Sequence, residues 1–347
     1  MTEDLKEKKI LVTGASGSLG SQILFELNKH NVKPIAHIRE SSDTTYIDSL
    51  GLEKRIADLR RRDQMASLVD GVDYIIHTAA YVNFRADRLT QFTGLNTIGA
   101  LDLFNAAKTS GVKRFLHVST VGAIGGINRK ENLKNLEDML ANEDTKFNLE
   151  HLRIPYIMTK HAAEVELIKA HDTSSKTELI MVNPSIIIAP SKTEDDRVRA
   201  LRLFGRLIFP EIPVRINMVD IRDVARGIVS ALKKGENGHR YILGGDNISV
   251  RELALTSSAV LGKIPHMVRF PRGLYDFTSS LSYMWSKVFG RANIKYYPDV
   301  VKLLDYDWAF SSKKAHDRFG YNWRSLHTTL EDIMTNNMVG TFMKPEP

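Results

Sequence analysis

The amino-acid sequence predicts an α/β protein: a doubly wound parallel sheet with helices on both faces and a smaller C-terminal cap. Short apolar runs alternate with segments of helical periodicity as far as Pro190, which is typical of a parallel sheet. A glycine-rich turn follows the first run, and the alternation becomes irregular after Pro190. The chain has 347 residues, a length that favours one large domain with a smaller dependent one.

The expected strands are short apolar runs that end in polar or turn-forming residues. They are Ile10–Val12, Val32–Ile38, Lys54–Ala57, Asp73–Thr78, Lys113–Thr120, Leu179–Ile188 and Arg240–Leu243. Helical periodicity predicts helices over Leu89–Lys108, Tyr156–His171, Arg197–Phe209, Met218–Lys234 and Arg251–Gly262. The dense charge of Asn128–Arg153 predicts an excursion over the surface.

The glycine-rich turn carries Gly14, Gly17 and Gly20, and the leucine and isoleucine residues behind it recur at helical spacing. Strand, glycine turn and helix in this order form the start of a dinucleotide-binding unit. The first glycine permits the tight turn, the second lets the backbone approach a pyrophosphate, and the third lets the helix pack on the strand. The free N–H groups of the helix N-terminus then bind the phosphate charge. We therefore predict a Rossmann nucleotide site; a glycine turn without a ligand is the alternative.

Composition excludes several classes of site. The chain has no cysteine, so it has no disulfide, thiolate nucleophile or cysteine metal site. A net charge of +7 suits an anionic cofactor, nucleic acid or a membrane surface, but no nucleic-acid-binding motif accompanies it. No run reaches the roughly 18 apolar residues of a membrane span, and the charged N-terminus lacks a signal-peptide core. We expect a cytoplasmic protein with no nucleic-acid partner, no transmembrane segment and no metal.

A tyrosine and a lysine supply the chemistry we consider most informative. Tyr156 and Lys160 lie four residues apart on a predicted helix, so their side chains share one face. A phenol has a reference pKa of about 10, and a neighbouring ammonium lowers it, which makes tyrosine a usable proton donor or acceptor. The preceding strand ends in Thr120, whose hydroxyl could hold a substrate oxygen. Tyr283 and Lys287 have the same spacing, but they lie in an apolar stripe, and we interpret them as structural.

Other segments follow in a recognisable order. They are Asp58-Leu59, His77-Thr78-Ala79-Ala80, Asn96–Gly99, Val118–Thr120, Pro155–Lys160, Val219–Ala225, Tyr241–Gly245, Ser312–Ala315 and Phe319–Tyr321. Together with Thr13–Gly20, these segments resemble the extended branch of the short-chain dehydrogenase/reductase superfamily. Within it, the chain is similar to the NAD(P)-dependent epimerase/dehydratase family, nearest its dihydroflavonol-reductase-like and hopanoid-associated members.

The resemblance implies a role for each matching position. Thr120 would hold the substrate carbonyl or hydroxyl, Tyr156 would be the acid/base, and Lys160 would grip the nicotinamide ribose. Asn96 also matches a position of the family, and the resemblance places it with the catalytic residues. The implied cofactor-binding residues are Gly14, Ser16, Gly17, Ser18, Leu19, Gly20, Arg39, Asp58, Leu59, Thr78, Ala79, Ala80, Pro184, Ser185 and Ile186, together with Tyr156 and Lys160.

Two departures from the family pattern bear on the reaction. Family dehydratases follow the catalytic threonine with an Asp-Glu pair, whereas Val121 and Gly122 occupy those positions here. The stretch Asn183–Pro190 is less polar than its counterpart in sugar-nucleotide enzymes, and Arg215 matches a diphosphate-binding arginine only loosely. The first departure removes the acid and the base that elimination of water needs, and the second disfavours a sugar nucleotide.

The second strand ends at Arg39, the position that meets the adenosine ribose in these folds. A guanidinium there pairs with a 2′-phosphate, whereas a carboxylate accepts hydrogen bonds from the ribose hydroxyls. We therefore expect NADP(H), with NAD(H) as the alternative because the next residue is Glu40.

The leading hypothesis is an NADPH-dependent reductase of a ketone or aldehyde, or a dehydrogenase of a secondary alcohol, acting on a rather apolar small molecule. A sugar-nucleotide epimerase is the second hypothesis, and a non-catalytic nucleotide-sensing protein is the third. The sequence does not determine the oligomeric state of the protein, and a homodimer is one of the alternatives.

The sequence divides into residues 1–190, a nucleotide-binding domain to which 218–243 returns, and a cap of residues 191–217 and 244–347. In the cap, one apolar helical face could pack in the core, line a substrate pocket or touch a membrane. It consists of Leu274, Phe277, Leu281, Met284, Trp285 and Val288. Large apolar side chains near this face favour a pocket wall over the nicotinamide; they include Phe270 and Phe289.

Overall fold

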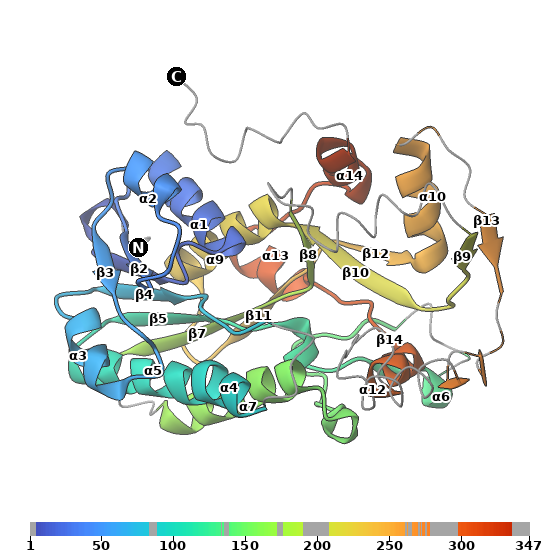
Figure 1. The fold of residues 1–347 in the computed structure, drawn as a ribbon, viewed down its shortest axis with the longest axis horizontal. Helices are drawn as coiled ribbons and strands as arrows, with labels where there is room; N and C mark the ends of the chain where they lie inside the picture. Colours follow the sequence, from blue (N-terminus) through green and yellow to red (C-terminus); the bar gives the residue numbers. More distant parts are fainter. Residues whose placement is uncertain are drawn as a thin grey trace.

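The computed structural model describes residues 5–82, 89–132, 134, 139–171, 176–189, 208–260, 262, 266–269, 271, 273–274, 276–277 and 298–334. Its main feature is a parallel seven-stranded sheet in the order β11-β7-β5-β4-β1-β2-β3 (Figure 1). The strands are β1 (Ile10–Thr13), β2 (Ile35–Ile38), β3 (Lys54–Ile56), β4 (Tyr74–His77), β5 (Arg114–Val118), β7 (Glu178–Pro184) and β11 (Arg240–Leu243). The predicted doubly wound sheet is confirmed.

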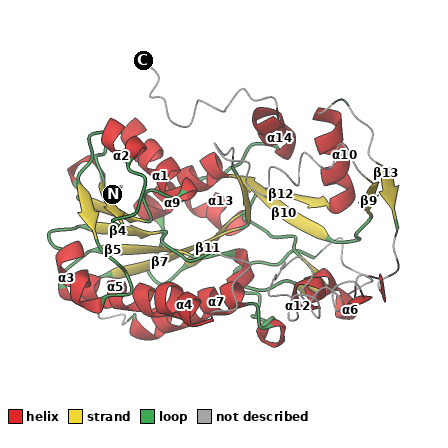
Figure 2. Cartoon of the chain, viewed as in Figure 1, coloured by secondary structure: helices red, strands yellow, loops and turns green. Residues whose placement is uncertain are grey.

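Helices cover both faces of this sheet, as Figure 2 shows. On one face lie α1 (Ser18–Lys29), α9 (Ile221–Lys234) and α13 (Lys313–Phe319). On the other lie α3 (Met65–Leu68), α5 (Ala100–Thr109) and α7 (Pro155–Ala170). Consecutive strand residues point to opposite faces, so Ile10 and Val12 pack in one core cluster and Leu11 in the other. Because these strands are buried on both faces, their sequences are nearly continuous runs of apolar residues.

A second part of the chain lies beyond the carboxyl ends of the large sheet (Figure 1). It contains a three-stranded sheet of β8 (Ile186–Ile188), β10 (Arg215–Asp220) and β12 (Asp246–Ser249), in the order β12-β10-β8. This sheet packs with α10 (Val250–Val260) and α14 (Leu326–Met334) in a separate apolar cluster. Of its elements, β12, α10 and α14 come from the residues expected in the cap, whereas β8 and the end of β10 come from residues expected in the nucleotide-binding domain.

Short elements complete the described chain. The remaining strands are β6 (Ile127–Asn128), β9 (Ile208–Pro210), β13 (His266–Val268) and β14 (Tyr306–Asp307), which form the pairs β6–β14 and β9–β13. The remaining α-helices are α2 (Thr45–Ser49), α4 (Leu89–Phe92), α6 (Arg129–Asn132) and α12 (Pro298–Lys302). Short 3-10 turns lie at Leu5–Glu7, Arg62–Gln64, Val121–Ala123, Glu150–Leu152 and Leu303–Asp305.

Two expected element boundaries were wrong. The helix expected from Met218 begins at Ile221, because Met218–Asp220 continue β10 and the Asp220 carboxylate caps the helix by accepting the Arg222 N–H at 2.8 Å. The single strand expected over Leu179–Ile188 divides at Ser185. Its first part, β7, pairs with β5 and β11, whereas β8 pairs with β10 in the other sheet.

One further expectation fails within the described residues, and another can be compared there only at its end. The stretch expected on the surface, Asn128–Arg153, contributes Ala141, Leu149 and Leu152 to the core, and Asn128 pairs with Tyr306. The helix expected over Arg197–Phe209 lies outside the described residues up to residue 207, and its end belongs to strand β9.

Much of the expected apolar face lies outside the described residues. Leu281, Tyr283, Met284, Trp285, Lys287, Val288 and the neighbouring Phe270 and Phe289 belong to that part. Leu274 and Phe277 are described, and 43% and 64% of their surfaces are exposed. Core packing is therefore excluded for these two side chains.

The C-terminal segment packs against both the large sheet and the three-stranded sheet. Ala315 and Phe319 of α13, with Tyr321, belong to the core on the α1–α9 face, so this segment lies apart from the cap to which the sequence assigned it. The fully buried Asp223 of α9 accepts hydrogen bonds from the backbone N–H of Arg324 at 2.8 Å and from its guanidinium at 2.9 Å. It also pairs with Arg226 at 2.6 Å.

We predict that Asp223→Ala lowers the free energy of unfolding by about 3–5 kcal/mol, because it leaves the two guanidinium groups without their carboxylate. Chemical denaturation followed by circular dichroism measures this loss. The matched control is Asp317→Ala, which removes the exposed ion pair with Lys313 and should cause no measurable loss. Equal stability of Asp223→Ala and wild type would contradict the assignment.

Candidate active site

The glycine turn after β1 has the geometry that a dinucleotide site needs. Gly14 has φ +69°, and a Cβ added there would lie 2.9 Å from the Cα of Ala79. A Cβ added at Gly20 would lie 2.1 Å from the carbonyl oxygen of Gly14, so a side chain would separate α1 from β1. Ser16, Gly17 and Ser18 are exposed at the start of α1, and Leu19 is half-buried. The first turn of a helix offers N–H groups to an anion, so this turn fits a pyrophosphate.

Thr13 fixes the loop that follows β4 against this turn. The Thr78 hydroxyl donates to the Thr13 carbonyl at 2.6 Å, and the Ala79 N–H donates to the Thr13 hydroxyl at 3.3 Å. Thr78, Ala79 and Ala80 are half-buried beside the glycines. This arrangement places the predicted cofactor-binding loop along the same sheet edge as the glycine turn.

Two charged residues lie at the expected adenosine end. Arg39 directly follows β2 and is exposed. Its N–H donates to the Ser42 hydroxyl at 3.0 Å, and its carbonyl accepts the Ser42 N–H at 3.0 Å. Asp58 follows β3, and its hydrogen bonds from the Arg60 guanidinium lower the pKa of its carboxyl to about 2. Leu59 is buried beside it. The carboxylate of Asp58 is therefore ionised and tied to Arg60.

Buried polar atoms without a partner in the described structure lie at the ends of β5 and β7. They are the Ser119 and Ser185 hydroxyls and the side-chain oxygen of Asn183. Buried polar groups are normally hydrogen-bonded, so these three atoms suit a polar ligand at this edge. Pro184 ends β7 and is buried, whereas 41% of the Ile186 surface is exposed. The residues present thus fit a nicotinamide dinucleotide.

Thr120 lies where the sequence expects it, at the carboxyl end of β5. It caps the 3-10 turn Val121–Ala123 and accepts the Gly122 N–H on its hydroxyl at 3.3 Å. The Asn183 amide donates to the Thr120 carbonyl at 3.0 Å and to the Glu164 carboxylate at 2.6 Å. These bonds connect the backbone of Thr120 to both β7 and α7, and its side chain is half-buried.

Lys160 is fully enclosed between α7 and β5. Its ammonium donates to the Val118 carbonyl at 2.7 Å and lies 3.2 Å from Nε2 of His117. Burial lowers the pKa of Lys160 to about 8, with Glu164 acting in the opposite direction. Tyr156 is half-buried one helical turn earlier and packs against the cluster of Leu152, Ile154 and their neighbours. Thr120, Tyr156 and Lys160 therefore all lie at the junction of β5 and α7.

Asn96 has a supporting position in this structure. It is buried in the π-helix η3 (Thr93–Gly99), and its amide accepts the Tyr81 N–H at 2.7 Å and donates to the Tyr81 carbonyl at 3.2 Å. The same amide lies 3.2 Å from the Thr159 hydroxyl on α7. Asn96 thus holds the loop after β4 and helix α7 in place, which makes it a positioning residue.

Sequence reasoning missed several residues that support the site. His117 contacts Lys160, Thr159 contacts Asn96, and Asn183 joins Thr120 to Glu164. His117 and Asn183 are polar residues inside otherwise apolar buried strands. A polar residue in a strand that is buried on both faces needs a hydrogen-bond partner, and this signal could have identified His117 and Asn183.

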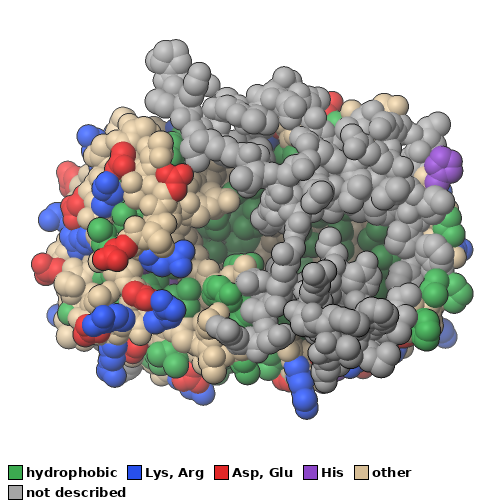
Figure 3. All heavy atoms as spheres, in the orientation of Figure 1, with side chains coloured by type: hydrophobic (Ala, Val, Ile, Leu, Met, Phe, Trp, Pro, Cys, Tyr) green, Lys and Arg blue, Asp and Glu red, His purple; other side chains and the backbone are tan. Residues whose placement is uncertain are grey.

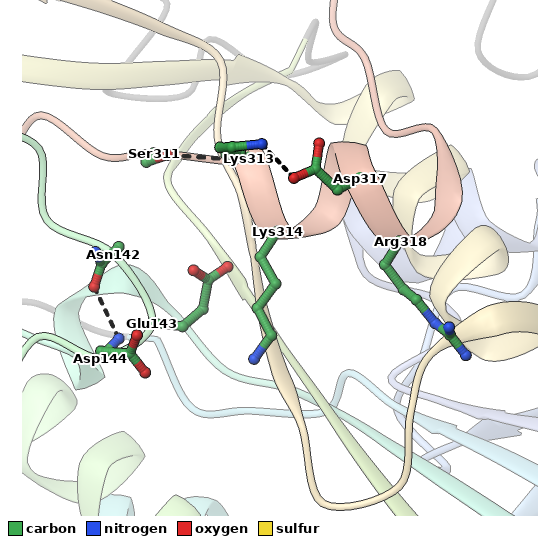
Figure 4. A pocket seen from close by; sticks show the side chains of 8 residues that line it. All are labelled: Asn142, Glu143, Asp144, Ser311, Lys313, Lys314, Asp317 and Arg318. Atoms are coloured by element: carbon green, nitrogen blue, oxygen red, sulfur yellow. Dashed lines mark hydrogen bonds and ion pairs between the residues drawn. The ribbon is translucent and has the colours of Figure 1, made fainter.

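A separate pocket of about 570 Å³ lies between α13 and the loop around Glu143, away from these residues (Figure 4). The buried Glu143 carboxylate accepts the Ile242 N–H at 2.8 Å, and burial raises its pKa. Lys314 extends from α13 alongside Glu143, and its ammonium lies 5.2 Å from the centre of the Tyr241 ring. Thr120, Tyr156 and Lys160 do not line this pocket, so we do not assign the reaction to it.

Two absences are limited to the described residues. They contain no cluster of histidine, aspartate and glutamate that could hold a metal ion. Among them we also find no helix with the length and hydropathy of a membrane-spanning segment.

Comparisons with known proteins identify relatives of this chain. The chain is 30% identical over 246 residues to sterol demethylase protein B of Methylococcus capsulatus, covering 70% of this chain and 71% of that protein. It is 26% identical to a putative dihydroflavonol 4-reductase of Synechocystis, over 93% and 92% of the two chains.

Solved structures show the same fold. The crystal structure of gox2253 matches with a TM-score of 0.80 and 25% identity, over 97% of this chain and 100% of that one. The UDP-glucose 4-epimerase of Thermotoga maritima matches with a TM-score of 0.71 and 20% identity, over 93% and 96%. The model of the NAD dependent epimerase/dehydratase family matches residues 10–244. The chain therefore belongs to the NAD dependent epimerase/dehydratase family, whose members are NAD(P)-dependent enzymes of the extended short-chain dehydrogenase/reductase type.

Proposed function

We propose that this enzyme is an NADPH-dependent reductase that converts a ketone or aldehyde of an apolar small molecule to the alcohol, or catalyses the reverse oxidation. The observation that carries the proposal is the junction of β5 and α7. There the buried Lys160 is bonded to Val118, two residues before Thr120, and Tyr156 lies one helical turn away. Carbonyl reduction requires these three groups: Thr120 to hold the substrate oxygen, Tyr156 to protonate it, and Lys160 to lower the pKa of the tyrosine.

A bound NADPH would supply the hydride. Thr120 would hold the substrate oxygen through its hydroxyl, and Tyr156 would transfer its phenolic proton to that oxygen as negative charge develops. The Lys160 ammonium, charged below its pKa of about 8, would stabilise the phenolate that remains. The carbonyl carbon gains the hydride and the oxygen gains the proton, so the reaction balances as a two-electron reduction.

Two observations favour this reaction over sugar-nucleotide chemistry. The Arg215 guanidinium, the candidate for a diphosphate, pairs with the fully buried Asp307 at 2.6 Å and donates to the Met139 carbonyl at 2.8 Å. Binding a diphosphate there would break a buried ion pair, which is costly. Val121 and Gly122 leave the turn after Thr120 without the carboxyl groups that elimination of water needs, which disfavours the sugar-nucleotide dehydratases of the family but does not bear on an epimerase.

Exposed apolar side chains support a substrate with little polarity. Val82, after the loop that follows β4, and Ile186, at the start of β8, expose 57% and 41% of their surfaces. In the view of Figure 3, hydrophobic side chains are visible in a hollow between the large sheet and the cap. Two relatives have names that imply apolar substrates, a sterol demethylase protein and a farnesyl-quinoline ketoreductase. A sterol-like or isoprenoid ketone is therefore the substrate class we propose.

The preference for NADPH is supported by the position of Arg39. It follows β2 at the carboxyl edge of the sheet and is exposed, and Asp58, after β3, is already paired with Arg60. Glu40, the next residue, is exposed as well. Structural relatives contain NAD, so NAD(H) is the competing cofactor for this chain.

We predict that Tyr156→Phe lowers kcat for carbonyl reduction by about 10²–10⁴-fold while leaving the Kd for NADPH nearly unchanged, because only the proton-carrying oxygen is lost. Lys160→Ala should impair both turnover and NADPH binding. Cofactor binding is measured by NADPH fluorescence and turnover by absorbance at the nicotinamide band.

The matched control for the tyrosine is Tyr46→Phe, which removes a hydroxyl that has no partner in the described structure, far from α7 on α2. Its activity should equal that of wild type. Full activity of Tyr156→Phe would refute the catalytic assignment.

We predict that Arg39→Ala weakens NADPH binding by roughly ten- to a hundredfold and NADH binding far less, because a charge-assisted contact to phosphate contributes about 1.5–3 kcal/mol. Dissociation constants for both cofactors, measured on wild type and variant, test this. Arg62→Ala is the control, since it removes an exposed guanidinium from the turn that follows β3, where it pairs with Asp102. A wild type that prefers NADH, or equal losses of both cofactors in Arg39→Ala, would contradict the proposed preference.

A further inference from the structure

We propose that His117 is a positioning residue for the reaction: a neutral imidazole that accepts a hydrogen bond from Lys160, keeps the ammonium in place and sustains its charge. The proposal rests on the proposed function in that it assigns Lys160 a part in the reduction. The contact itself, between Nε2 of His117 and the ammonium at 3.2 Å, is independent of any substrate.

The sheet register explains how the two side chains meet. His117 is the residue before Val118 on β5, and its side chain is fully buried. Lys160 reaches down from α7 and donates to the Val118 carbonyl, which brings its ammonium to the imidazole of the preceding residue. An ammonium has donors and no acceptor, so Nε2 must accept, and the single proton of the neutral ring lies on Nδ1.

The surroundings keep this imidazole neutral. Burial, and after it the charge of Lys160, hold the pKa of His117 well below its ordinary value. His77 on β4 is the neighbouring titratable group, with ring centres 5.3 Å apart, and burial lowers its pKa to about 3. His77 in turn lies 2.8 Å from the Thr13 hydroxyl. Both shifts favour the neutral form of the imidazole.

The carboxylate of Glu164, the other charged group near Lys160, forms hydrogen bonds with other residues. The Glu164 carboxylate on α7 accepts the Asn183 amide from β7 at 2.6 Å and the Arg240 guanidinium from β11 at 3.2 Å. It raises the pKa of Lys160 from a distance, but no hydrogen bond between the two is described. Within the described structure, Val118 and His117 therefore supply the acceptors that face the ammonium.

This arrangement predicts a specific consequence. Removing the His117 acceptor leaves the charged form of Lys160 less stabilised while the neutral form is little affected, so the pKa of Lys160 falls below about 8. A residue that only filled space would change stability without moving that pKa. A glutamine at this position keeps an oxygen acceptor of similar reach and cannot be protonated, so it should preserve the wild-type pKa.

The direct test is an NMR titration of the lysine side chains in the full chain labelled with ¹³C and ¹⁵N lysine, without cofactor or substrate. The Lys160 signal is assigned by its loss in Lys160→Met. We expect a midpoint near pH 8 in wild type and in His117→Gln, and a fall of about one pH unit, a tenfold change in acid dissociation constant, in His117→Leu. His117→Met provides a second apolar variant with an unbranched side chain.

The control is His37→Leu, which removes another buried imidazole from the same sheet, one bonded to the Ala57 carbonyl and not to Lys160. It should leave the Lys160 midpoint unchanged. An unchanged midpoint in the apolar His117 variants, or an equal shift in His117→Gln, would overturn the proposal.

A second readout links the contact to turnover. In the reductase assay, the fall of kcat at high pH should begin at lower pH in His117→Leu than in wild type, and His117→Gln should restore it. Since the NMR titration needs no turnover, failure to find a carbonyl substrate would contradict the proposed function and leave the His117–Lys160 contact to be decided by the titration.

Discussion

The ammonium of Lys160 lies in the protein interior, where no bulk water hydrates it. Burying an unpaired charge is among the most costly events in folding, so its position depends on acceptors supplied by the protein. The Val118 carbonyl and the His117 imidazole provide them, and both belong to β5. Helix α7 must therefore lie in one place and one rotation relative to this strand, and Tyr156 is fixed with it.

Polar contacts on the same helix maintain that position. Thr97 donates to the Thr159 carbonyl at 3.0 Å, and Asn96 reaches the Thr159 hydroxyl from the same π-helical turn. Farther along α7, Glu164 is joined through Asn183 to the carbonyl of Thr120. π-helical turns are rare and often occur at functional sites, and here the turn places two side chains against α7. The three proposed catalytic residues are thus held by one buried network.

Sequence patterns predicted the parts of this network that depend on local structure. The strand–glycine–helix start, the strand that ends at Thr120 and the helical spacing of Tyr156 and Lys160 all follow from short segments. Met218–Asp220 was assigned to a helix because so short a run fits both periodicities, and its pairing with β8 and β12 makes it part of a strand. His117 and Asn183 were missed as site residues because their partners lie 43 and 19 residues away on α7. Local periodicity in the sequence does not predict contacts between residues so far apart in the chain.

The central claim is that this site transfers a hydride to a carbonyl and releases an alcohol. The most direct measurement incubates the enzyme with NADPH deuterated at the transferred position of C4. Sterol-like and isoprenoid ketones form one panel, UDP- and dTDP-hexoses another, and mass spectrometry analyses the products. The account predicts deuterium on the carbinol carbon of an alcohol, with one NADPH oxidised for each product molecule. Formation of a sugar-nucleotide epimer without net oxidation of the cofactor would contradict it.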